Sequence, residues 1–167
     1  VLMGLVEWIR RGFSALWLGN LLNECGIELA GSSGEKISGA TAARLLDMAG
    51  VGWSRERYRL LENLALKLEY RADKAREGGD ESEEERGCDA DELAGEAGKA
   101  RALHERLQTV LNLIPDRDLV RMDELAAGLL GALNELCPES VLNEELNRYA
   151  REGLSRLLAE GPGRAEV

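Results

Sequence analysis

Two long segments with a seven-residue apolar repeat, separated by a short acidic stretch, constrain the fold of this sequence more than any other feature. In residues 54–77 and again in residues 89–114, apolar side chains recur at alternating intervals of three and four. That spacing places them on one stripe of an α-helix. Residues 78–88 between the segments read GGDESEEERGC, and their glycines and mutually repelling carboxylates disfavour regular structure. We therefore predict an antiparallel helical hairpin with a mobile acidic connector, 78–88, at its tip.

The same apolar pattern returns twice further along the chain. Residues 119–136 repeat it up to a Cys-Pro turn, and residues 139–160 carry leucines, a tyrosine and alanine on one helical face. Short connections between consecutive helices favour antiparallel neighbours. No window alternates with the period of two that is typical of a strand. We predict an all-α fold, an antiparallel bundle of four long helices, as a single domain over residues 1–160 with a frayed tail at 161–167.

Residues 1–24 are apolar at helical spacing, and we predict one N-terminal amphipathic helix there. Arg10 and Arg11 interrupt the apolar run, so it is too short to span a membrane. Three of the seven aromatic residues of the chain lie here, namely Trp8, Phe13 and Trp17. Such a helix usually covers the core of its own domain, and the alternative is that the aromatic residues dock a partner. A membrane surface is not expected, because membrane-surface helices carry a richer basic face.

Residues 26–37 contain several Gly and Ser and are predicted to form a loop, followed by a short helix over 38–49 that Ser38 caps. Residues 41–61 thus have the outline of a helix-turn-helix. The second helix of this outline carries three arginines near its start, where DNA-reading helices place such side chains: Arg55, Arg57 and Arg59. The net charge of −10 opposes binding to phosphates, so a DNA-binding regulator is only the second alternative.

Four carboxylates near the hairpin tip form the first alternative site. They make two pairs, each four residues apart, that come level across the hairpin: Glu69 with Asp73, and Glu92 with Glu96. Carboxylates grouped at one level can hold Mg²⁺, as they do in all-α nucleotide pyrophosphohydrolases. The spacing here is one residue longer than in the Glu-x-x-Glu and Glu-x-x-Asp pairs of those enzymes. The simpler interpretation is therefore that these carboxylates lie on solvent-exposed helix faces and form salt bridges. The alternative is a Mg-dependent nucleotide-hydrolysing enzyme.

No stretch of the sequence carries a specific catalytic signature. His104 is the only histidine, and the three cysteines, Cys25, Cys88 and Cys137, lack the spacing of a metal site or a disulfide framework. The cysteines indicate a reducing, cytoplasmic setting, and we expect no cofactor. The sequence is 44% hydrophobic and 31% charged, which is typical of a globular domain. We predict a non-catalytic helical interaction or scaffold subunit that binds a protein partner or itself; nucleic acid is not expected as a partner.

Overall fold

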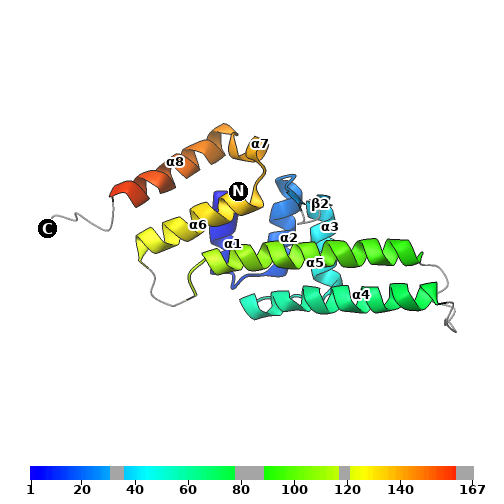
Figure 1. Ribbon diagram of the computed structural model, residues 1–167. Coiled ribbons are helices and arrows are strands. Elements are labelled where there is room, and N and C mark those ends of the chain that lie inside the picture. The colour runs from blue at the N-terminus through cyan, green and yellow to red at the C-terminus, as the bar shows by residue number, and fades with distance from the viewer. Residues whose placement is uncertain (31–35, 78–88, 117–120, 161–167) are drawn as a thin grey trace.

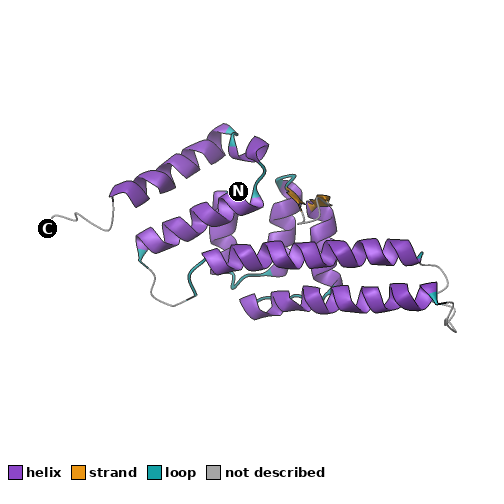
Figure 2. Ribbon diagram, viewed as in Figure 1, coloured by secondary structure: helices purple, strands orange, loops and turns teal. Residues whose placement is uncertain are grey.

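The computed structural model describes residues 1–30, 36–77, 89–116 and 121–160, and most of these are helical (Figures 1 and 2). The all-α character is therefore confirmed. The predicted connector 78–88 and tail 161–167 lie outside the described residues. The helices are α1 (Leu2–Arg10), α2 (Ala15–Glu24), α3 (Gly39–Met48), a 3₁₀ helix η1 (Arg55–Arg59), α4 (Leu60–Arg76), α5 (Ala90–Leu113), α6 (Met122–Leu136), α7 (Glu139–Leu142) and α8 (Glu145–Glu160).

Helices α4 and α5 lie side by side and antiparallel, as predicted for the hairpin (Figure 1). Near the tip their contact is a small apolar cluster made of Leu68, Ala72, Leu93 and Ala97. Two of these four side chains are alanines, so the helices can approach closely at this end. An ion pair from Arg76 of α4 to Asp91 of α5, at 3.1 Å, also joins the two helices.

The other long helices follow one another in a series. Helix α6 packs on α5, where Arg106 and Glu135 form an ion pair of 2.6 Å, and α8 packs on α6. Helices α1, α2 and α3 lie behind α5, so that the main core is enclosed between these three helices, α5 and α6 (Figure 1). Helix α8 lies at the outer edge of the molecule (Figure 1). A closed bundle of all four long helices stays a prediction.

The N-terminal segment forms two helices, and the prediction of one continuous helix over 1–24 is wrong. Helix α1 ends at Arg10, and just beyond it Gly12 and Phe13 both have positive φ angles, 63° and 59°. The amides of these residues bond back to carbonyls of α1, and the Ser14 hydroxyl accepts a bond from the Trp17 amide at the start of α2. A glycine that ends a helix and a serine that caps the next one outweigh the apolar periodicity.

A two-stranded antiparallel sheet replaces part of the predicted loop. The prediction that the fold contains no strands is therefore also wrong. Strand β1 is Glu28–Ala30 and β2 is Lys36–Ser38. Leu29 lies opposite Ile37, and both side chains are buried in the main core. Three residues per strand are too few to produce a visible alternation in the sequence, and burial of this pair stabilises the sheet.

Two further predicted helices are divided. Residues 54–77 begin with η1 rather than an α-helix, because Ser54 has a φ of 81° and its hydroxyl donates to Glu56 instead of capping. Residues 139–160 are divided into α7 and α8, and the buried Asn147 side chain donates to the Val141 carbonyl at the break. The short helix α3 agrees with its prediction, with Ser38 at its start and Gly50 at a φ of 69° after its end.

The close packing of α2 against α3 depends on Gly39. A Cβ atom added at Gly39 would lie 2.4 Å from the carbonyl of Leu22, whereas one added at Gly95 in α5 meets open space. We expect Gly39→Ala to lower the free energy of unfolding by about 1–3 kcal/mol through overpacking. The matched variant Gly95→Ala should raise it by about 0.5–1 kcal/mol, because alanine favours the helix. Urea unfolding followed by circular dichroism measures both; equal stabilities would contradict this packing.

No helix among the described residues is long and apolar enough to cross a membrane.

Candidate functional site

The aromatic side chains of the N-terminal segment pack largely inside the protein. Trp8 is fully buried, and its indole Nε1 donates to the Tyr58 hydroxyl at 3.0 Å. That hydroxyl donates in turn to the Phe13 carbonyl at 3.0 Å, and burial raises the pKa of Tyr58 well above its usual range. The Trp8 ring meets the rings of Phe13 and Tyr58 edge to face. Half-buried Trp17 donates to the Gly4 carbonyl at 3.0 Å. These contacts join α1, α2 and η1.

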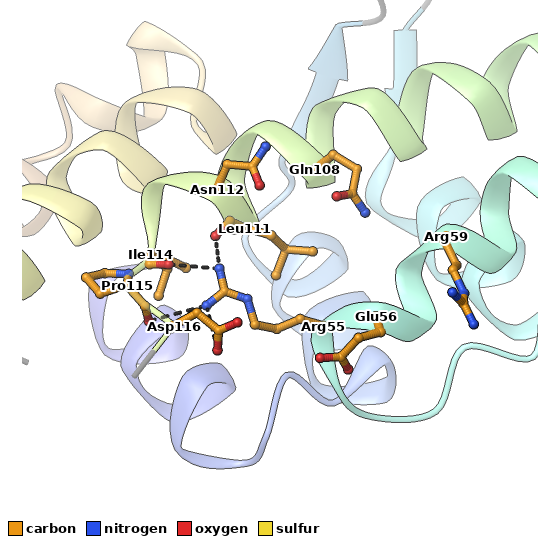
Figure 3. Close-up of a pocket in the computed structure, with 9 residues that line it drawn as sticks. All are labelled: Arg55, Glu56, Arg59, Gln108, Leu111, Asn112, Ile114, Pro115 and Asp116. Atoms are coloured by element: carbon orange, nitrogen blue, oxygen red, sulfur yellow. Dashed lines mark hydrogen bonds and ion pairs between the residues drawn. The ribbon is translucent and has the colours of Figure 1, made fainter. Parts of the chain in front are cut away.

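Arg55 extends this network to the end of α5 (Figure 3). Its guanidinium lies 5.0 Å from the centre of the Phe13 ring. It donates to three carbonyls at the last turn of α5 and just beyond, those of Leu111, Ile114 at 2.8 Å and Pro115 at 3.3 Å. The last carbonyls of a helix lack partners within the helix and carry its negative end, so a cation there is stabilising. With only 14% of its side chain exposed, Arg55 acts as a cap for α5.

This capping contact borders an open groove of about 500 Å³ between η1 and the end of α5 (Figure 3). Both carboxylates that line it have partners: Asp116 lies 3.5 Å from Arg55, and the Ser54 hydroxyl donates to Glu56 and is the main cause that lowers the pKa of that carboxyl. Of the three arginines predicted to contact DNA, Arg55 is thus committed to the fold, while Arg57 and Arg59 are exposed. All three lie on η1, not at the start of an α-helix that would enter a groove of DNA.

The four candidate metal ligands do not come together. Glu69 pairs with Arg101 at 2.7 Å, and Asp73 lies 3.6 Å from Arg76. Glu96 accepts a bond of 2.6 Å from Arg44 of α3, and Glu92 is exposed. In the described part of the chain, no group of three or more Asp, Glu, His or Cys side chains is placed to hold a metal ion. Two of the carboxylates, Glu69 and Glu96, therefore form ion pairs between helices, and Asp73 forms one within α4.

Two cysteines and the single histidine are the other reactive side chains among the described residues. Cys137 is buried, and burial raises the pKa of its thiol to about 11, so little nucleophilic thiolate forms near neutral pH. Cys25 is half-buried and also a free thiol. His104 is half-buried on α5.

Helix α8 has three large apolar side chains that are at least half exposed, more than any other helix in the described structure. At about 100° per residue, its apolar side chains extend over an arc of about 180°. The half of this arc that faces α6 holds Ala150, Leu154 and Leu158, and Leu154 is only 8% exposed. The other half, which we call the outer face of α8, consists of Leu146, Tyr149, Gly153 and Leu157. Its three large side chains are 83%, 56% and 50% exposed.

The sequence placed the apolar residues of α8 on one face without distinguishing its two halves. Every one of these residues fits the helical period equally well, and only the position of α6 divides them. The width of the arc was a usable signal, because a helix that packs on a single neighbour needs a narrower apolar stripe.

Comparison of the chain with protein-family models, with curated proteins and with solved structures gives no match.

Proposed function

We propose that this protein is a non-catalytic helical interaction subunit whose binding surface is the outer face of α8. The observation that carries the proposal is the exposure of Leu146, Tyr149 and Leu157 along one side of a helix whose opposite apolar half is buried. Contiguous exposed apolar side chains on a folded domain are typical of protein-binding surfaces. A partner helix on this face would complete the bundle that the apolar periodicity predicts.

The other candidate sites have less support. The arginines and carboxylates singled out by the sequence are used in helix capping or ion pairs, or lie exposed. The free thiols of Cys25 and Cys137 are compatible with a reducing, cytoplasmic setting, which is part of the proposal.

Site-specific photocrosslinking tests the proposal. A benzophenone side chain replaces Tyr149 on the outer face of α8, or, as the matched control, Tyr70 of α4, which is also a tyrosine and is 61% exposed. After irradiation in cells that make the protein, we expect position 149 to give one adduct of defined mass and position 70 to give none.

Two results would count against the proposal: no adduct from position 149, or the same adducts from both positions. Circular dichroism of the two purified variants should match the unmodified protein, because both tyrosines are exposed.

A further inference from the structure

We infer that the occupant of the outer face of α8 is α8 of a second copy of this chain, packed antiparallel. This inference rests on the function proposed above and identifies the partner. It follows from three features of α8: the order of its large and small residues, the placement of its charges, and its lack of net charge.

The order of residues on the outer face suits an antiparallel pair related by a two-fold axis. If Leu146 lies opposite Leu157 of the second copy, the midpoint of the contact falls between residues 151 and 152, and Gly153 of each copy lies next to it. Large side chains then cover both ends of the contact, and the smallest residues meet at its centre. A Cβ atom added at Gly153 would meet nothing within 4 Å, so the backbone there is open to a neighbouring helix. Small residues at a crossing allow helices to approach closely.

The charges beside the outer face favour the antiparallel direction. Glu145 and Arg156 lie at opposite ends of α8 on the same flank, next to Tyr149. In an antiparallel pair this flank faces the same flank of the second copy, so Glu145 of each copy comes within reach of Arg156 of the other. In a parallel pair the flank faces Ala150 and Leu154 instead, so neither charge meets an opposite charge of the other copy, and the partner of Arg156 is then Glu152 of its own helix, at 4.0 Å. Such rim pairs contribute chiefly to orientation.

Helix α8 is also the right place for an acidic chain to meet its own copy. The whole chain carries a net charge of −10, which opposes self-association. The 16 residues of α8 contain three glutamates and three arginines, so their formal charges sum to zero. At about 1.5 Å per residue the helix is about 24 Å long, which gives a contact at the small end of specific interfaces. We therefore expect a dimer with a dissociation constant in about the micromolar range.

Sedimentation equilibrium of the full chain, from about 5 to 500 μM, tests this inference across the dissociation range expected for so small a contact. The wild-type chain should shift from monomer to dimer. Leu146→Glu should weaken dimerisation by at least about tenfold, because it buries a charge at both ends of the contact. Leu66→Glu, the same change at a leucine of α4 that is 54% exposed, should leave the dimer unchanged.

Charge reversal tests the direction of packing. Glu145→Arg alone and Arg156→Glu alone should each weaken dimerisation, and an equal mixture of the two variants should restore it, because every Arg then faces a Glu. A dimer that neither reversal affects, or that the mixture does not restore, would overturn the antiparallel arrangement.

The same experiments separate failure of this inference from failure of the proposed function. A wild-type chain that stays monomeric, together with an adduct from position 149 that contains a different protein, overturns self-docking and leaves the proposed function supported. A monomeric chain without any adduct from position 149 overturns both. An adduct with the mass of two copies of this chain supports both.

Discussion

Trp8→Ala should lower the free energy of unfolding by about 3–5 kcal/mol, the largest loss that we expect from any single substitution in this chain. Trp8 is fully buried where α1, α2 and η1 meet, so its removal leaves a large cavity. It also leaves the Tyr58 hydroxyl without its hydrogen-bond donor. Thermal and urea unfolding followed by circular dichroism measure the loss.

Trp53→Ala is the matched control, because Trp53 is 74% exposed, and its effect should stay within about 0.5 kcal/mol. If Trp8→Ala prevents folding, Tyr58→Phe tests the same network more gently. It removes only the hydroxyl between Trp8 and the Phe13 carbonyl and should cost about 1–3 kcal/mol. A Tyr58→Phe variant as stable as the wild type would contradict the buried hydrogen-bond chain.

Arg55→Ala should lower the free energy of unfolding by about 2–3 kcal/mol. The variant loses hydrogen bonds from a charged donor to three carbonyls at the end of α5 and the contact with the Phe13 ring. Hydrogen exchange should show the loss of protection concentrated in the last turn of α5, because that turn loses its cap. Urea unfolding gives the total effect.

Two variants identify the cause of this loss. Arg55→Lys keeps the positive charge but not the planar set of donors, so it should recover less than half of the lost stability. Arg59→Ala removes an exposed arginine that lines the same groove and should change stability by less than about 0.5 kcal/mol. An Arg59→Ala variant as unstable as Arg55→Ala would show that the charge of the groove, not the cap, stabilises this region.

Parts of the fold with strong local signals were predictable from the sequence. The α4–α5 hairpin follows from two long apolar repeats on either side of an acidic stretch, and α3 follows from Ser38 and Gly50 at its ends. The division of the N-terminal segment also had a local signal, Gly12 followed two residues later by Ser14. Apolar periodicity continues in phase across this break, so it hides the signal unless the capping residues are given more weight.

The roles of the candidate site residues were not predictable in the same way. In the sequence, Trp8 was a candidate partner contact and Arg55 a candidate DNA contact. The residues to which they donate hydrogen bonds lie about 50 or more positions away in the chain. No local pattern specifies a hydrogen bond from Trp8 to Tyr58 or from Arg55 to the end of α5. Such contacts depend on how the N-terminal helices are placed against the hairpin.

The sequence by itself determined the helical character, the hairpin and the apolar arc of α8, because each depends on residues within a few turns of one another. Only the tertiary structure decided which half of that arc is covered. The inner half packs on α6, and the outer half, with Leu146, Tyr149 and Leu157, stays exposed. Periodicity specifies the direction in which a side chain leaves its helix, whereas burial also requires another element on that side, and that is a property of the whole fold.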